Sequence, residues 1–362
     1  MGNDARQSCD ILISGTGYYA EIMVADLAAA ARTPLSVIIA GRNTARMAWL
    51  VEACRARAAN FGTPVTFSSA QLDSTSAASI AETLDGIRPR VIVQSASAQS
   101  PWRVDNNESD WARLVAKAGF GLTIAFNSLL SFRTASAMKT LGLDGHFVNT
   151  CYPDGVNQVL AQAGLPITSG VGNIAIFSAI IGGRLPPEQR ADLRVLAHHR
   201  HIVEWRKPPS QRAGAPVRAW VGDRELTDVD ARTGDIQLPH RELNLISAAN
   251  AVPVLLALAG EGARRVHVPG PGGRTGGYPV IADASGVVLD LPAGLTEEEA
   301  LAWNAQFEDA DGVSIRDGQV IYAERVRSLL AEHSPELAKG FRVSDVEEAA
   351  AALGELRDRM TA

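Results

Sequence analysis

Cysteines, aromatic residues and long apolar runs are all scarce in this sequence. The three cysteines, Cys9, Cys54 and Cys151, lie far apart and form no C-x-x-C pair, so we expect neither a disulfide framework nor a zinc site. The longest apolar run, near 174–181, is much shorter than the ~20 residues that span a bilayer, and residues 1–10 lack the apolar core of a signal peptide. These absences predict a cytoplasmic protein in a reducing compartment, with no membrane partner.

A dominant charge of either sign is also missing. The 34 Lys and Arg residues are scattered and face 40 Asp and Glu residues, giving a formal net charge of −6. This balance gives no electrostatic reason to expect a nucleic-acid partner. The sequence also lacks an H-x-x-x-H helix, an EF-hand loop and a serine nucleophile elbow, so we expect no metal and no covalent hydrolase. A small-molecule substrate remains the expected partner.

The first half of the sequence alternates short apolar runs with helical segments. This alternation predicts right-handed crossovers and a doubly wound parallel sheet. The expected strands are at 10–15, 36–40, 65–68, 90–94, 146–149 and 166–170, and the expected helices are at 18–31, 44–60, 76–84 and from about 154.

The pattern changes beyond Gly183. We expect strands within 193–205 and 216–221, a helix at 243–258, a hairpin over 280–291 turning at Ser285-Gly286, and a helix capped by Thr296. The chain of 362 residues suits two domains of roughly 150 residues. The predicted class is therefore α/β: a Rossmann domain at 1–183, then a mixed α/β domain at 184–362 for substrate binding and oligomerisation. We expect a homo-oligomer.

The first strand ends in a glycine motif. The residues are Gly15-Thr16-Gly17-Tyr18-Tyr19-Ala20, a G-x-G-x-x-A pattern between a strand and a helix. Gly15 allows a tight turn, Gly17 lets the backbone approach a pyrophosphate, and Ala20 lets the helix pack closely. The helix N-terminus offers unpaired N–H groups to the phosphates. We predict dinucleotide binding here; the alternative is an ordinary strand–helix turn.

The end of the second strand bears on which dinucleotide binds. Enzymes that prefer NAD usually carry an acid there for the ribose hydroxyls, whereas this chain has Arg42, Asn43 and Arg46. The guanidinium groups suit a 2′-phosphate, so the sequence favours NADP over NAD. The alternative is a solvated helix start. Ser95 and Ala96, after the fourth strand, are also expected to contact the cofactor.

Two stretches resemble known dehydrogenase families. The segment 37–98, with A-G-R-N, a long helix and V-I-V-Q-S-A-S-A, resembles the N-terminal domain of saccharopine dehydrogenase-type reductases. The segment 147–183, with Y-P-D, G-L-P and G-V-G-N-I, is similar to the lactate/malate dehydrogenase superfamily. The second resemblance implies that Asn149 orients substrate and nicotinamide, that Arg103 polarises the carbonyl, and that His199 donates the proton.

The helix 173–182 departs from that superfamily. It lacks both the acid that would pair with the histidine and the arginine that would clamp a carboxylate. A 2-hydroxy acid substrate therefore does not follow from the resemblance.

A histidine suits hydride transfer because it gives or takes a proton near neutrality. A strand over 193–203 would place His199 and His201 on one face and His198 on the other; the alternative is a surface strand with solvated histidines. If His199 and His201 lie away from the nicotinamide, the candidates become Tyr278, Asp154 and His267.

These patterns together predict an NADP-dependent oxidoreductase that moves a hydride to or from a small carbonyl or imine. Two alternatives stay open. One is an imine-forming reductase of the saccharopine or opine type. The other is a non-catalytic NADP-binding sensor or scaffold.

Overall fold

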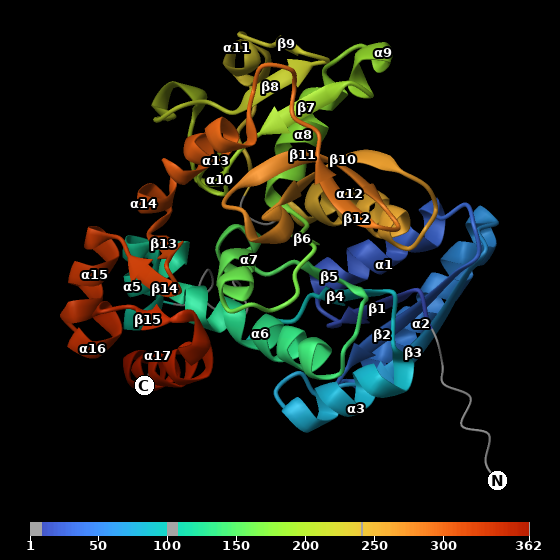
Figure 1. Ribbon diagram of the computed structural model, residues 1–362, viewed down its shortest axis with the longest axis horizontal. Coiled ribbons are helices and arrows are strands. Elements are labelled where there is room, and N and C mark those ends of the chain that lie inside the picture. Colours follow the sequence, from blue (N-terminus) through green and yellow to red (C-terminus); the bar gives the residue numbers. More distant parts are fainter. Residues whose placement is uncertain (1–8, 100–107, 240–241, 362) are drawn as a thin grey trace.

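A six-stranded parallel sheet forms the centre of the molecule (Figure 1). The computed structural model describes residues 9–99, 108–239 and 242–361. The strands lie in the order β3–β2–β1–β4–β5–β6, and every neighbouring pair is parallel. This is the strand order of the Rossmann fold, so the predicted fold class is confirmed. The strands are β1 (Ile11–Ser14), β2 (Leu35–Gly41), β3 (Val65–Gln71), β4 (Val91–Gln94), β5 (His146–Asn149) and β6 (Ser169–Gly170).

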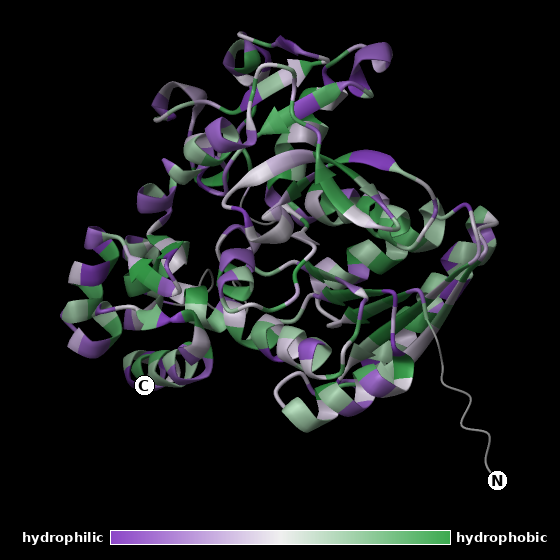
Figure 2. Cartoon of the chain, viewed as in Figure 1, coloured by the Kyte–Doolittle hydropathy of each residue, from purple (hydrophilic) through white to green (hydrophobic). Residues whose placement is uncertain are grey.

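Helices cover both faces of this sheet, because its central strands are apolar on both sides. Ile11 and Ile13 face one hydrophobic cluster and Leu12 faces another, as the near-continuous apolar run of a buried parallel strand predicts. Figure 2 shows much of the length of these strands in the green of hydrophobic residues. The first face is covered by α1 (Tyr18–Ala30), α2 (Thr44–Phe61) and α12 (Asn244–Leu258), and the second by α3 (Ala77–Ile87), α6 (Ile124–Thr140) and α7 (Pro153–Gln162).

Three small antiparallel sheets and short helices make up most of the rest. The sheets are β7–β8–β9, β10–β11–β12 and β13–β14–β15. Their strands are β7 (Leu193–Leu196), β8 (Arg218–Val221), β9 (Arg224–Glu225), β10 (Arg264–Pro269), β11 (Gly277–Asp283), β12 (Gly286–Leu289), β13 (Val313–Arg316), β14 (Gln319–Tyr322) and β15 (Phe341–Arg342). The helices are α5 (Asp110–Ala118), α8 (Asn173–Gly183), α9 (Pro187–Arg190), α10 (Arg200–Trp205), α11 (Val229–Thr233), α13 (Glu297–Ala305), α14 (Glu308–Asp311), α15 (Glu324–Ala331), α16 (Pro335–Ala338) and α17 (Val346–Thr361). Single 3-10 turns lie at η1 (Phe120–Thr123), η2 (Pro209–Gln211), η3 (Pro271–Gly273) and η4 (Val343–Asp345).

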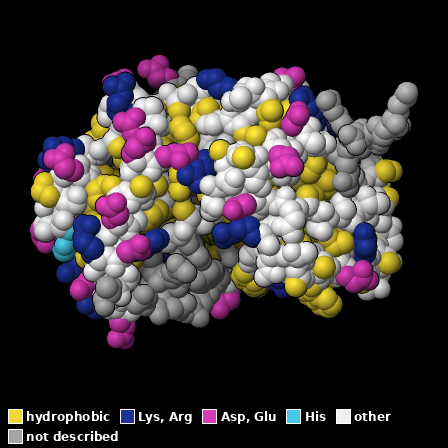
Figure 3. Space-filling model, turned by 90° about the horizontal axis from the view of Figure 1, so that it is seen from below, with side chains coloured by type: hydrophobic (Ala, Val, Ile, Leu, Met, Phe, Trp, Pro, Cys, Tyr) yellow, Lys and Arg dark blue, Asp and Glu magenta, His cyan; other side chains and the backbone are white. Residues whose placement is uncertain are grey.

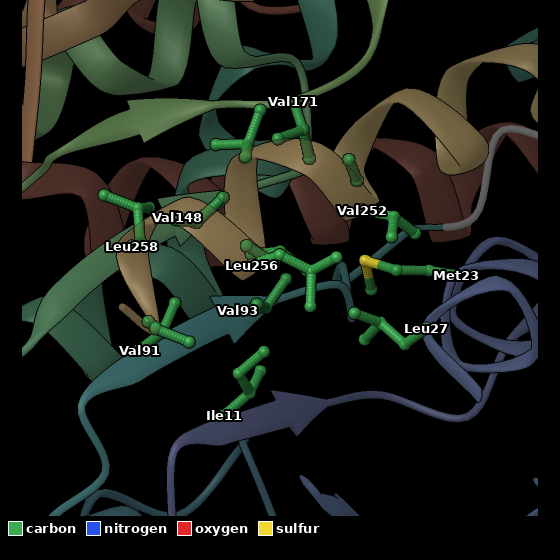
Figure 4. Packing of buried hydrophobic residues seen from close by; sticks show 14 of the residues in the cluster. Ile11, Met23, Leu27, Val91, Val93, Val148, Val171, Val252, Leu256 and Leu258 are labelled. Carbon is green, nitrogen blue, oxygen red and sulfur yellow. The ribbon is translucent and has the colours of Figure 1, made fainter. Parts of the chain in front are cut away.

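Elements from the second half of the chain pack directly on the Rossmann helices. α12 lies against α1, where Met23 and Leu27 meet Val252 and Leu256 (Figure 4). α17 lies against α6 on the other face. The hydrophobic clusters therefore extend across residue 183, and the division into units 1–183 and 184–362 remains a prediction.

The expected strand over 193–205 is wrong beyond Leu196. The chain forms β7 and then turns into α10, because imidazole groups satisfy the backbone N–H groups where the helix begins. His198 Nδ1 accepts from the Arg200 N–H at 3.1 Å, and His201 Nδ1 accepts from the His198 N–H at 2.9 Å. His199 and His201 consequently do not share a strand face.

Two smaller expectations also change. The strand expected at 166–170 is limited to Ser169–Gly170. In the predicted hairpin, Asp283 pairs with Gly286, so the turn is Ala284–Ser285. The predicted helix start at Thr296 is confirmed, with a reciprocal capping box to Glu299.

The surface seen in Figure 3 carries acidic and basic side chains side by side, without a large field of one sign on that face. Within residues 9–99, 108–239 and 242–361, no single helix is long and apolar enough to cross a membrane. Only the bent pair 110–118 and 120–140 meets the length and composition requirements together.

The contact between α1 and α12 yields a test of the fold. Leu256 is 2% exposed, whereas Leu245 on the same helix is 57% exposed. We expect Leu256→Ala to lower the free energy of unfolding by about 2–5 kcal/mol, because it leaves a cavity in the core. Leu245→Ala should change it by no more than about 0.5 kcal/mol. Urea unfolding measures both; equal effects would contradict the packing of α12 on α1.

Candidate active site

Gly15 is required by the fold. Its φ is 130°, and a Cβ placed on it would lie 3.0 Å from the backbone nitrogen of Ala96. The segment after β4 approaches this closely because Ser95 and Ala96 both donate their N–H groups to the carbonyl of Ser14, at 2.8 and 3.0 Å. The predicted cofactor residues Gly15, Ser95 and Ala96 are thus neighbours at the carboxyl edge of the sheet.

Gly17 stands in a different environment. It is exposed, its φ is −74°, and a Cβ placed on it would meet no protein atom within 4 Å. The helical hydrogen bond from Glu21 N to Gly17 O is 2.9 Å long. The N–H groups of residues 18–20 precede that bond, so they have no partner within the helix. Packing within the protein therefore does not demand glycine here, whereas close approach of a phosphate would.

The other residues of the motif have structural contacts. Ala20 is fully buried against the sheet. Tyr19 donates its hydroxyl to the carbonyl of Ser247 on α12 at 3.1 Å, and burial raises the pKa of Tyr19 well above its ordinary value. Thr16 lies beside Gly41, where an added Cβ would be 3.1 Å from its methyl group. Tyr18 is 47% exposed at the helix start.

The three polar residues after β2, Arg42, Asn43 and Arg46, have different contacts. Asn43 caps α2, accepting from the Arg46 N–H at 2.9 Å. The guanidinium of Arg46 pairs with Glu21 of α1 at 2.7 Å. Arg42 is exposed and makes no hydrogen bond or ion pair with the part of the chain that the structure describes. Hydrogen bonds from Thr75 lower the pKa of Asp73, and Arg42 adds to that effect across the same sheet edge.

Asn149 is held entirely by the protein. It is fully buried; its amide nitrogen donates to Cys151 O and Asn157 Oδ1, both at 2.9 Å. Its oxygen accepts from Ser131 Oγ at 3.1 Å and from Cys151 N at 2.9 Å. These four bonds use the full capacity of an amide. Asn149 therefore shapes the turn after β5. Its hydrogen bonds give no support to a contact with substrate, and that contact remains a prediction.

His199 is bound to a carboxylate. Its Nδ1 lies 2.9 Å from Oδ1 and 3.2 Å from Oδ2 of Asp311 at the end of α14. Tyr152, at the N-terminus of α7, donates its hydroxyl to Asp311 Oδ2 at 2.6 Å. The Asp311 side chain is 4% exposed and that of His199 is 16% exposed. The acid that helix 173–182 lacks is thus supplied by a residue far along the chain.

A second carboxylate lies on the backbone side of the same histidine. Asp154 Oδ1 accepts from the His199 N–H at 3.2 Å, and its other oxygen accepts from the Asn173 amide. Burial raises the pKa of Asp154 to about 6, against the opposing charge of His199. Burial alone would lower the pKa of His199, but the Asp311 carboxylate raises it above its ordinary value. In turn, His199 holds the pKa of Asp311 well below its usual range despite burial.

The other residues proposed for proton transfer or substrate binding make hydrogen bonds within the protein or lie outside the described residues. His201 Nε2 bonds to Ala215 O at 3.1 Å, and its ring stacks on Trp303. His267 Nε2 accepts from the Val195 N–H at 3.1 Å, and Tyr278 donates to Thr275 O at 2.7 Å. Arg103 lies outside the described residues.

A short series of contacts links the glycine motif to His199. A Cβ on Gly172 would lie 3.9 Å from the hydroxyl of Tyr19, and the next residue, Asn173, binds Asp154. Asp154 in turn binds the backbone of His199. The two groups therefore lie along one edge of the sheet.

The Gly/Pro tract at 268–279 is explained by close packing. An added Cβ at Gly273 would lie 2.2 Å from Ala161, and one at Gly277 would lie 2.5 Å from Ile174. The tract thus packs closely against α7 and α8. The sequence carries no signal for Asp311, because this residue lies in a short acidic helix, Glu-Asp-Ala-Asp, with no motif around it. Tyr152 had one signal, its position just after a strand.

Comparisons with known proteins give distant structural likenesses. No family model matches the chain, and no curated protein matches it. A minor L-lactate dehydrogenase from Enterococcus mundtii has 14% identity and a TM-score of 0.47, over 84% of this chain and 97% of that one. A malate dehydrogenase from Aeropyrum pernix has 15% identity and a TM-score of 0.48, over 91% and 99%. A Cryptosporidium parvum lactate dehydrogenase, complexed with lactic acid and a nicotinamide adenine dinucleotide, has 14% identity and a TM-score of 0.43, over 96% and 98%.

Likenesses of this extent assign no function to the chain. The resemblance to saccharopine dehydrogenase-type reductases remains a prediction.

The buried ion pair predicts a pH-dependent stability. Its contribution should be present between the ordinary pKa values of Asp and His, about 3.9 and 6.5. It is lost as pH falls through the lowered pKa of Asp311, and as pH rises through the raised pKa of His199. Asp311→Asn should therefore lower the free energy of unfolding by about 1–3 kcal/mol near pH 6, with a smaller deficit in alkaline solution. Urea unfolding across pH tests this; a deficit that grows from pH 6 into alkaline solution would contradict it.

Proposed function

We propose that this chain is an oxidoreductase that uses a nicotinamide dinucleotide and acts on a small carbonyl or imine. The observation that carries the proposal is the His199–Asp311 pair, at the same sheet edge as the glycine motif. Ligands of doubly wound folds bind at this carboxyl edge. A small-molecule substrate, a homo-oligomer and a cytoplasmic location remain predictions.

The residues at the start of α1 fit a dinucleotide. The open space at Gly17 and the unpaired N–H groups of residues 18–20 suit a pyrophosphate. Ser95 and Ala96 lie where the chain leaves β4, next to Gly15. When bound, the cofactor would supply or accept the hydride.

His199 would exchange the proton that accompanies the hydride. Its Nδ1 is engaged by Asp311, so Nε2 is the nitrogen that remains for a substrate oxygen or nitrogen. The Asp311 carboxylate stabilises the imidazolium, which makes His199 a proton donor near neutral pH. The rings of Phe120 and Tyr152, centred 5.7 and 5.1 Å from the imidazole, limit the access of water.

The same pair bears on the non-catalytic alternative. That alternative drew its support from the acid and the arginine that helix 173–182 lacks, and Asp311 offers a partner that replaces the acid alone. An imine-forming reductase stays open, because it would require the same proton donor. Substrate-dependent oxidation of the cofactor only with both an amine and an oxo acid would distinguish it.

We further propose that NADP is preferred over NAD. Arg42 has no hydrogen-bonding partner among the described residues, so its guanidinium is available for a 2′-phosphate. Arg46 lies one helical turn further along α2 and is oriented by its ion pair with Glu21. Asn43 fixes the start of that helix.

Cofactor preference is testable by calorimetry. The parent protein should bind NADP(H) at least ten-fold more tightly than NAD(H), about 1.4 kcal/mol. Arg42→Asp should reverse this order, because it replaces a phosphate-binding group with an acceptor for ribose hydroxyls. Gly17→Val is the control: a Cβ at this position meets no protein atom within 4 Å, so we expect the fold to remain while both dinucleotides lose binding. Equal affinities in the parent would overturn the preference.

The proton-donor role is testable by steady-state kinetics on a panel of carbonyl and imine substrates. We expect His199→Gln to lower turnover by ~10²–10⁴-fold while the cofactor Kd stays unchanged, because the imidazole would meet the substrate and not the pyrophosphate. His333→Gln, on an exposed histidine, should match the parent. If His199→Gln kept parental turnover, another group would be the donor. If the parent bound cofactor but never turned over, the non-catalytic alternative would be favoured.

A further inference from the structure

Two local features of the chain serve to place the ring of Tyr152. The residue has a left-handed backbone, with φ 43° and ψ 58°, a conformation that a bulky side chain rarely adopts. One turn into α7, Gly155 leaves the space that the ring needs. A Cβ on Gly155 would lie 2.8 Å from Cε1 of Tyr152. The turn after β5 is thus shaped around this tyrosine.

The hydroxyl of Tyr152 reaches the carboxylate that holds His199. It donates to Asp311 Oδ2 at 2.6 Å, while His199 Nδ1 lies closest to Oδ1, at 2.9 Å. The tyrosine and imidazole rings also touch edge to face, with centroids 5.1 Å apart. Asp311 is therefore held from two sides: Tyr152 bonds to Oδ2, whereas His199 lies closest to Oδ1 and also contacts Oδ2 at 3.2 Å.

We propose that Tyr152 is a positioning residue that acts on His199 through Asp311. By donating to Oδ2, it fixes the position of the carboxylate and, through the carboxylate, the orientation of the imidazole ring. By donating to the anion, it also limits how strongly Asp311 attracts the proton of His199. The proposal rests on the proposed role of His199 as proton donor, and it assigns to Tyr152 no contact with substrate.

The sign of the expected effect follows from electrostatics. The Tyr152 hydroxyl points its positive end at Asp311, which stabilises the carboxylate most when His199 is neutral. Removing the hydroxyl therefore disfavours neutral His199, and its pKa should rise. The charged or titratable groups that face His199 are Asp311 from α14, Asp154 from α7, Tyr152 before α7, and His198 and Arg206 from its own segment. Tyr152→Phe changes none of the others and keeps the ring packing.

The test is an NMR titration of His199, assigned by comparison with His199→Gln. In Tyr152→Phe we expect the pKa of His199 to rise, and the alkaline limb of the pH–rate profile for reduction to move upward with it. Tyr278→Phe is the matched control, since that buried hydroxyl donates to a backbone carbonyl; the pKa of His199 should not move. Because the titration needs no turnover, it separates failure of this proposal from failure of the proposed function.

A further variant keeps the proposal testable if Tyr152→Phe does not fold, and a double variant tests whether the effect passes through Asp311. A ring-fluorinated tyrosine at position 152 is a stronger donor and should lower the pKa of His199. In an Asp311→Asn background, Tyr152→Phe should leave that pKa unchanged, because the intermediary is gone. An unchanged or lowered pKa in Tyr152→Phe itself, or an equal rise with and without Asp311, would overturn the proposal.

Discussion

The Asp311 carboxylate is buried, and a buried anion needs donors around it. Its donors come from two distant segments, Tyr152 after β5 and His199 before α10. These two hydrogen bonds connect the carboxyl edge of the Rossmann sheet to α14 and to the turn that precedes α10. The position of His199, the candidate proton donor, is thus determined by the need of the buried Asp311 carboxylate for donors. Asp154 strengthens the arrangement by holding the backbone of His199.

Glycines at the carboxyl edge of the sheet serve two different purposes. At Gly273 and Gly277 the lack of a side chain lets the Gly/Pro tract press against α7 and α8. Gly15 likewise allows the turn after β1 to meet the segment after β4. Gly17 differs, because the space beside it is empty of protein. Packing accounts for the first group, whereas close approach of a ligand gives a physical reason for the second.

Local pattern predicted much of the fold and part of the site. Buried parallel strands are apolar on both faces and alternate with helices, so the central sheet and its class could be read directly. The glycine motif was placed correctly between strand and helix for the same reason. The segment 193–205 misled because its apolar residues suit a strand. The side chains of His198 and His201 instead satisfy the backbone where α10 begins.

The sequence by itself determined the order of strands and helices and the glycine turn, because these depend on neighbouring residues and on spacing. The tertiary structure decided which carboxylate meets His199. Asp311 lies 112 residues away, in a short helix without a motif, and only the packing of α14 near the end of β5 brings it close. Tertiary structure also decided that Asn149 is saturated by protein hydrogen bonds. Such pairings depend on burial and on which donors remain unpaired, and no local stretch of sequence contains that information.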